Sequence, residues 1–113
     1  KGRSFKIQGT GNEIRSFIYI DDFLDAFDLI IKHGKNQNIY NIGTSTKIKI
    51  RTLAYKISKI LKKNIILKKT TLAKGGTKIR VPNIKKIKKL GFEPKFNLDK
   101  GLKRCLKIET ERN

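Results

Sequence analysis

A glycine-rich turn that runs into an arginine is the first feature of this sequence with chemical potential. Residues 9–22 read GTGNEIRSFIYIDD, in which Gly9 and Gly11 precede Arg15 and an apolar run. A dinucleotide-binding loop needs a third glycine three residues after the second, at the start of a helix. That position is Ile14, and a strand is predicted to follow it. The turn is therefore not a nicotinamide-cofactor loop.

The candidate for chemistry in this stretch is Arg15, which stands at the mouth of the predicted strand. A guanidinium in that place can hold a diphosphate through two parallel hydrogen bonds, which lysine does less well. The alternative is a surface arginine on a hairpin. Residue types alone favour neither interpretation.

A second glycine loop lies at 74–80, with the sequence KGGTKIR. Its three cations, Lys74, Lys78 and Arg80, flank the glycines, an arrangement that suits an anionic ligand. An exposed loop in a basic protein would look the same, and we favour that simpler interpretation slightly on sequence grounds.

Tyr55 and Lys59 have the Tyr-x-x-x-Lys spacing, which places a phenol and an ammonium on one helical face. A neighbouring lysine can lower the pKa of a phenol and prepare it as a general base. Here the pair falls on a lysine-rich amphipathic helix whose core positions are filled by leucine and isoleucine. We therefore interpret it as part of an ordinary packing helix.

Metal and nucleophile chemistry receives little support. His33 is the single histidine and is predicted in the last turn of a helix, where it would interact with the helix dipole. Cys105 is the single cysteine, which excludes an internal disulfide, fits a reducing cytoplasm and is expected to act as a small apolar side chain. No set of residues has the spacing of a metal site or a catalytic triad.

Charge dominates the composition, with 28 Lys+Arg against 9 Asp+Glu and a formal net charge of +19. Such a field attracts polyanions and phosphorylated small molecules, so a small basic nucleic-acid-binding protein is an alternative function. The lysines are scattered, however, and Phe17, Phe23 and Phe27 have core spacing instead of alternating with cations as on a stacking surface. Nucleic acid is therefore not the expected partner.

The chain has 113 residues, enough for one domain with a modest core. It contains no methionine, from which we expect a piece of a longer protein. No apolar stretch approaches the ~20 residues that cross a membrane, so no membrane partner is predicted. We expect one partial domain over 1–113, located in the cytoplasm.

Strands alternate with helices in the predicted element order, which indicates an α/β fold with short strands. Strands are expected over 5–8, 17–20, 39–42 and 65–67. Helices are expected from Asp21 or Asp22 to Gly34, from about 50 to Asn64, from Pro82 to Gly91, and from Asn97 onward. Asp21 or Asp22 and Asn97 are expected as N-caps, and Gly34 as a left-handed C-cap. Expected core-facing residues are Phe23, Phe27, Ile30, Ile31, Leu53, Ala54, Ile57, Ile60, Leu61, Ile84, Ile87, Leu98, Leu102, Cys105 and Leu106.

Five motifs in one order carry a family resemblance. They are GTGNEIRSFIYIDD at 9–22, YNIG at 40–43, RVPNIKK at 80–86, LGFEP at 90–94 and LDKGL at 98–102. Together they resemble the C-terminal part of the NAD-dependent sugar-nucleotide epimerases and dehydratases, the extended short-chain dehydrogenases/reductases. Each motif is weak alone, but their order covers nearly the whole chain.

The resemblance implies roles for particular residues. Arg15 falls on the arginine that binds the nucleotide diphosphate, and Arg80 on a second arginine of the sugar-nucleotide pocket, with Lys74 a weaker candidate. Asn41 and Gly43 fall on the segment that returns to the Rossmann sheet. Asn83 departs from the family, which commonly has an acidic residue there.

The resemblance also implies that this chain is the substrate-binding part of a Rossmann-type enzyme. Such an enzyme, an epimerase or a dehydratase, oxidises a nucleotide-diphosphate sugar at C4. In that family an N-terminal domain holds NAD and the catalytic Tyr-x-x-x-Lys pair, and the full-length enzyme is expected to be a homodimer. This chain lacks the cofactor glycine loop, and its Tyr55/Lys59 pair falls where the family has an ordinary packing helix, so we expect no catalytic residue, no NAD site, no metal and no activity in it alone. The alternatives are the nucleic-acid-binding protein and a non-catalytic partner of a full-length relative.

Overall fold

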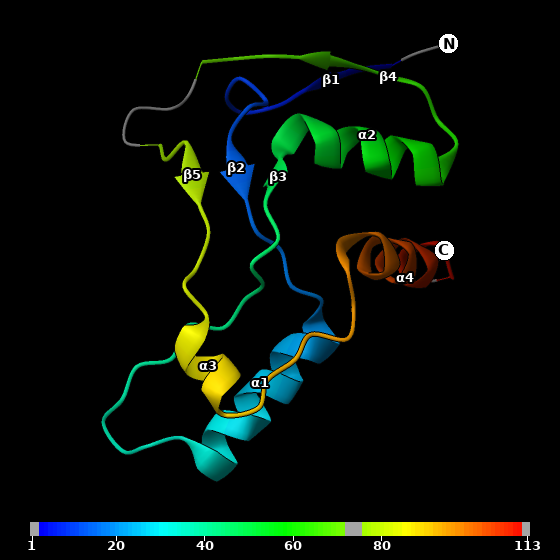
Figure 1. Cartoon of the computed structure of the whole chain (residues 1–113). Coiled ribbons are helices and arrows are strands. Elements are labelled where there is room, and N and C mark those ends of the chain that lie inside the picture. Colours follow the sequence, from blue (N-terminus) through cyan, green and yellow to red (C-terminus); the bar gives the residue numbers. More distant parts are fainter. Residues whose placement is uncertain (1–2, 72–75, 112–113) are drawn as a thin grey trace.

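Short strands alternate with helices in the computed structural model, which describes residues 3–71 and 76–111 (Figure 1). In chain order the elements are β1 (Arg3–Lys6), β2 (Ile14–Arg15), α1 (Ile20–His33), β3 (Ile48–Lys49), α2 (Ile50–Leu61), β4 (Ile65–Lys68), β5 (Ile79–Arg80), α3 (Lys85–Lys89) and α4 (Leu98–Glu111). The predicted α/β class is confirmed. None of the helices in these described ranges is both long and apolar enough to cross a bilayer.

Two small sheets organise the upper half of the molecule in Figure 1. β1 pairs in parallel with β4, so that Arg3 lies opposite Ile65. β2 is the central strand of the other sheet, antiparallel to β3 and parallel to β5. The predicted strand at 65–67 is confirmed as β4, and the predicted strand at 5–8 begins two residues earlier, as β1.

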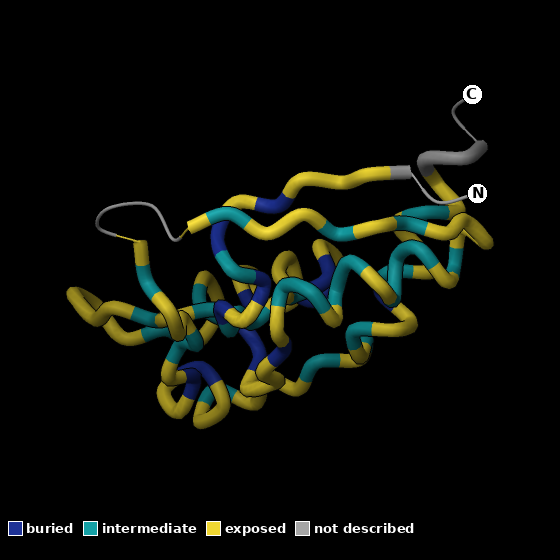
Figure 2. Tube along the Cα trace, turned by 90° about the horizontal axis from the view of Figure 1, so that it is seen from above, coloured by how far each residue is buried: buried dark blue, intermediate teal, exposed yellow. Residues whose placement is uncertain are grey.

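The buried core lies between α1 and α3, which are neighbours in Figure 1. Ala26 and Ile87 are fully buried there, with Ile84 and Phe92 beside them. This confirms the prediction that α3 buries its isoleucines. Buried segments are short elsewhere (Figure 2), and the radius of gyration is 16.6 Å, against about 13 Å for a compact domain of this size. The chain is an open, flat structure.

The apolar face predicted to be the core side of α1 is largely exposed. Phe23, Phe27 and Ile31 have exposed fractions of 38%, 50% and 68%. The helix instead turns Asp22 and Ala26 inward. Leu61 and Cys105, also expected in the core, are exposed as well. The periodicity identified the helices correctly but assigned burial wrongly, because few described elements cover these faces.

The ends of α1 differ from the prediction. Tyr19 is the N-cap residue and makes no side-chain capping bond, whereas Asp22 lies inside the helix, fully buried. Gly34 is extended, with φ −65°, and not left-handed. A Cβ on Gly34 would lie 2.5 Å from the carbonyl oxygen of Ile30, so close approach of the backbone explains the glycine.

Two predicted strands are absent from the described ladders. Over 17–20 the chain leaves β2 after Arg15, because the Ser16 hydroxyl donates to the Thr44 carbonyl at 2.6 Å and draws the two segments together. The segment 39–42 pairs with no described strand, and Ile39 is 80% exposed. An apolar run predicts a strand only where a neighbouring edge exists to receive its hydrogen bonds.

The remaining helices agree with the sequence. α2 follows β3 directly, with Ile57 and Ile60 half-buried on one side. Asn97 caps α4 as predicted, since its Oδ1 accepts the backbone N–H of Lys100 at 2.8 Å. The ring of Phe96, just before this cap, stacks on Tyr19 with a centroid distance of 4.4 Å.

Candidate functional site

The two arginines singled out by the sequence lie side by side. Arg15 on β2 and Arg80 on β5 are Cα partners in the parallel ladder, 65 positions apart in sequence. Directly opposite residues of neighbouring strands project from the same face of a sheet. The fold therefore brings the two guanidinium groups to one surface, which the sequence order alone did not show.

Both guanidiniums converge on Thr77. Nη2 of Arg15 donates a hydrogen bond to the Thr77 carbonyl oxygen at 2.7 Å, and Nη2 of Arg80 donates to the Thr77 hydroxyl at 3.3 Å. Nη1 of Arg15 also donates to the Ile14 carbonyl oxygen at 2.9 Å. These bonds orient Arg15, which is half-buried, while Arg80 remains exposed.

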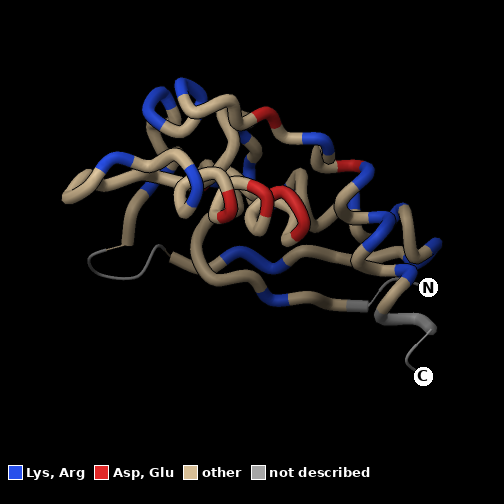
Figure 3. Tube along the Cα trace, turned by 90° about the horizontal axis from the view of Figure 1, so that it is seen from below, with Lys and Arg blue, Asp and Glu red and all other residues tan. Residues whose placement is uncertain are grey.

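Neither arginine forms an ion pair with a carboxylate of the described residues. Within the described part of the chain, the ion pairs join Lys32 to Asp28, Lys56 to Asp99 and Lys95 to Asp25. Four of the nine acidic residues belong to α1 (Figure 3), in a part of the fold separate from the β2–β5 ladder. Two adjacent guanidiniums without a carboxylate partner form a surface that attracts an anion with several oxygens.

A cavity of about 460 Å³ adjoins Arg15. It lies against β1 and the glycine turn, and its lining includes Phe5, Ile7, Glu13 and Gly76. The volume is in the range of small-molecule sites. Lys74, the third predicted ligand-binding residue, is outside the described residues.

The glycine turn binds an anion of its own, the carboxylate of Glu13. One carboxylate oxygen accepts the Thr10 N–H at 3.0 Å and the Thr10 hydroxyl at 2.9 Å, and the other accepts the Gly11 N–H at 2.9 Å. Hydrogen bonds from the backbone N–H groups of Thr10 and of Glu13 itself lower the pKa of Glu13 to about 2. Glu13 is only 5% exposed.

The sequence analysis missed Glu13. The available signal was a carboxylate two residues after Gly11 in a turn of glycine and threonine, because consecutive N–H groups in such turns form a concave anion site. The amides of Thr10 and Gly11 therefore already bind the Glu13 carboxylate and are not available to another anion.

The glycine turn at 9–13 does not fit the phosphates of a dinucleotide cofactor. A dinucleotide loop presents free amides at the start of a helix, whereas here the amides of Thr10 and Gly11 already bind Glu13, and the turn continues into β2.

Other candidate groups from the sequence stay apart from the arginines. Tyr55 is 52% exposed on α2, and His33 is exposed at the end of α1. In residues 3–71 and 76–111, no cluster of His, Cys, Asp and Glu could hold a metal ion.

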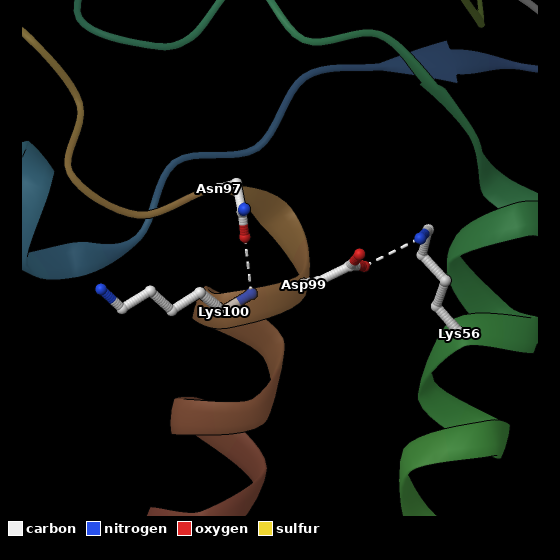
Figure 4. A network of polar contacts seen from close by, with 4 residues as sticks. All are labelled: Lys56, Asn97, Asp99 and Lys100. Carbon is white, nitrogen blue, oxygen red and sulfur yellow. Dashed lines mark hydrogen bonds and ion pairs between the residues drawn. The ribbon is translucent and has the colours of Figure 1, made fainter.

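A second, apolar cavity of about 370 Å³ lies between α2, α4 and the segment 17–20. Cys105 is one of its lining residues. Between the same two helices, Lys56 of α2 forms an ion pair of 2.8 Å with Asp99 of α4, beside the Asn97 cap (Figure 4). This hydrogen bond and the charge of Lys56 lower the pKa of Asp99.

Comparison with known proteins supports the fold and the family resemblance. Residues 1–43 match the NAD dependent epimerase/dehydratase family. A dTDP-D-glucose 4,6-dehydratase of Dictyostelium discoideum is 46% identical over 54 residues, which are 48% of this chain and 12% of that protein. The chain is similar to the NAD-dependent epimerase/dehydratase family. This confirms the resemblance derived from the five motifs.

Further relatives align over nearly the whole chain. A trifunctional UDP-glucose 4,6-dehydratase/UDP-4-keto-6-deoxy-D-glucose 3,5-epimerase/UDP-4-keto-L-rhamnose-reductase of Arabidopsis thaliana is 27% identical over 112 residues, 97% of this chain and 17% of that protein. The solved UDP-glucose 4-epimerase of Thermotoga maritima, with UDP-glucose, superimposes with a TM-score of 0.85 at 28% identity, covering 96% of this chain and 35% of that one. The chain thus spans about a third or less of the length of these relatives.

Proposed function

We propose that this chain is the substrate-binding portion of an enzyme that acts on a nucleotide-diphosphate sugar, and that Arg15 and Arg80 together hold the diphosphate. The observation that carries the proposal is the pairing of these two residues in the β2–β5 ladder, with no carboxylate partner in the described part of the chain. Similarity to the NAD-dependent epimerase/dehydratase family supports the substrate class, as does the Thermotoga maritima relative solved with UDP-glucose.

The arrangement suits a diphosphate better than a single phosphate. Arg15 is held by the carbonyls of Ile14 and Thr77, which fixes the plane of its guanidinium. Among the described residues, the Arg80 guanidinium makes one hydrogen bond, of 3.3 Å to the Thr77 hydroxyl, and keeps freedom to follow a ligand. A fixed and an adjustable guanidinium can each take one phosphate group, and the binding energy then aligns the sugar for reaction.

The proposal for these residues is limited to substrate binding. Oxidation of the sugar at C4, the NAD site and the catalytic Tyr-x-x-x-Lys pair would belong to parts of the enzyme beyond residues 1–113, and the chain alone would be inactive. The full-length enzyme would be a homodimer. Lys74 would add a further cation near the ligand.

Calorimetric titration of the chain with UDP-glucose and dTDP-glucose tests the proposal. Arg15→Ala is expected to weaken binding by about 1.5–3 kcal/mol, the range for hydrogen bonds to charged groups. Arg104→Ala, which removes the same charge from an exposed position of α4, is the matched control and should leave Kd within twofold.

Two results would contradict the proposal. One is a wild-type chain that binds neither nucleotide sugar. The other is an equal loss of affinity in Arg15→Ala and Arg104→Ala, which would indicate attraction by the net charge of +19 instead of a built site.

A further inference from the structure

The turn at Gly9–Glu13 is a structural junction as well as a self-filled anion site. Its carbonyl groups point toward α2: Gly11 O accepts the N–H of Arg51 at 2.9 Å, and Glu13 O accepts the N–H of Ile50 at 3.0 Å. Ile50 and Arg51 are the first two residues of α2, whose N-terminal N–H groups have no partner inside the helix. The turn therefore caps a helix that has no side-chain cap.

The same turn joins the two sheets. Gly9 O accepts the N–H of Thr70, just beyond β4, at 2.7 Å, and the Thr70 hydroxyl accepts the N–H of Gly9 at 2.7 Å. On the other side, Ile14 donates its N–H to the carbonyl of Lys78 at 2.7 Å, immediately before β5. The position of β2 between its neighbours is thus set by the turn that precedes it.

One side chain holds this junction in shape. The Glu13 carboxylate ties Thr10 and Gly11 to the start of β2, two residues before Arg15. Gly9 and Gly11 both have positive φ, +95° and +87°, so the turn has a conformation that most residues resist and that needs an internal constraint. Glu13 and Arg15 also line the same cavity, although Glu13 binds the amides of the turn and Arg15 binds the Thr77 carbonyl oxygen.

We infer that Glu13 is a positioning residue for the diphosphate site: by filling the amides of the turn with its own carboxylate, it fixes β2 so that Arg15 and Arg80 stay in register, and it directs the ligand's phosphates to the arginines instead of the turn. The inference rests on the proposed function for the identity of the ligand. Its structural half, the control of the β2–β5 register, is independent of any ligand.

The first test is amide hydrogen exchange without ligand. In Glu13→Ala, exchange at Ile14 should accelerate at least tenfold, because its bond to Lys78 depends on the turn, while the amides of α4 keep their wild-type rates. Asn97→Ala, which removes the cap of α4, is the matched control and should show the reverse pattern. Unchanged exchange at Ile14 in Glu13→Ala would overturn the inference whether or not the chain binds a nucleotide sugar.

The second test is chemical rescue of binding with formate, a small carboxylate that can occupy the emptied turn. UDP-glucose binding should weaken about tenfold in Glu13→Ala and recover when formate is added. In the wild-type chain and in Asn97→Ala, formate should only compete and weaken binding. This opposite sign distinguishes positioning by a carboxylate from general destabilisation.

The results separate the two proposals. If the wild-type chain binds no nucleotide sugar but Ile14 exchange responds to Glu13→Ala and to formate, the positioning role stands and the diphosphate assignment fails. If the wild-type chain binds UDP-glucose and Glu13→Ala binds it equally well, the positioning role fails alone. Should Glu13→Ala not fold, the isosteric Glu13→Gln, which keeps one acceptor oxygen, is judged by the same Ile14 exchange criterion.

Discussion

The Asp22 carboxylate accepts the backbone N–H of Phe96 at 3.0 Å, across 74 positions of sequence. Its other oxygen accepts the N–H of Lys95 at 2.9 Å. One fully buried side chain of α1 thus holds the segment that enters α4 and sets the place where Phe96 stacks on Tyr19. An acidic residue that the sequence suggested as a helix cap is instead a tertiary connection.

Replacement of Asp22 should therefore destabilise the fold strongly. Asp22→Ala leaves the N–H groups of Lys95 and Phe96 without their acceptor, and we expect a loss of about 1.5–3 kcal/mol in the free energy of unfolding. Asp21→Ala, at an exposed neighbouring position, should change it by less than about 0.5 kcal/mol. Urea denaturation measures both, and equal losses would show that the helix charge matters more than the tertiary bonds.

Glycine replacements separate backbone strain from crowding. Gly9, Gly11 and Gly91 all have positive φ, but a Cβ on Gly91 would meet nothing within 4 Å. At Gly9 the Cβ would lie 2.9 Å from the Glu13 carboxylate. Gly91→Ala should lower the free energy of unfolding by about 1–2 kcal/mol through its positive φ alone. Gly9→Ala should lower it clearly more, because its Cβ would also meet the Glu13 carboxylate. Urea denaturation of both variants measures these free energies. A smaller loss for Gly9→Ala than for Gly91→Ala would mean that the turn relaxes without the Glu13 contacts.

Stability should depend on pH through Glu13. Hydrogen bonds to the turn lower its pKa from 4.5 to about 2 in the folded chain, so below pH 4.5 the unfolded state takes up a proton that the folded state does not. The contribution is complete above pH 4.5 and is lost as the pH falls toward 2. Thermal melts of wild type and Glu13→Gln should therefore converge over this window, and parallel curves would argue against the anion site of the turn.

Arg15 and Arg80 should act on the ligand as a coupled pair. In a double-mutant cycle, Arg15→Ala and Arg80→Ala together should lose less nucleotide-sugar affinity than the sum of the single losses, with a coupling of about 0.5–3 kcal/mol, because both groups bind one diphosphate. Titration calorimetry provides the four dissociation constants. Strictly additive losses would place the two arginines on separate ligands or remove one of them from the site.

Local sequence signals were sufficient to predict the helices and to single out candidate site residues. The apolar spacing in α2 and α3, the Asn97 cap and the apolar run at β4 are short-range features, so neighbouring residues were enough to predict them. The five motifs likewise identified the family, and with it Arg15 and Arg80 as candidates.

Strand pairing and burial were decided only by the tertiary structure. β5 has two residues, too few to carry a pattern, and exists because β2 lies beside it. The run at 39–42 has the composition of a strand but pairs with none of the described strands. Hydrogen-bonded ladders and buried faces depend on what lies across from a segment, and its own residues do not contain that information.

The sequence by itself thus determined an α/β chain that resembles the NAD-dependent epimerase/dehydratase family, with Arg15 and Arg80 as candidate binding residues. Only the tertiary structure showed that Arg15 lies opposite Arg80 and that the glycine turn binds the Glu13 carboxylate. It also showed that Asp22 makes a long-range hydrogen bond and does not cap its helix. The physical reason is common to all three. Each is an interaction whose geometry depends on the three-dimensional path of the backbone, which separation along the sequence does not specify.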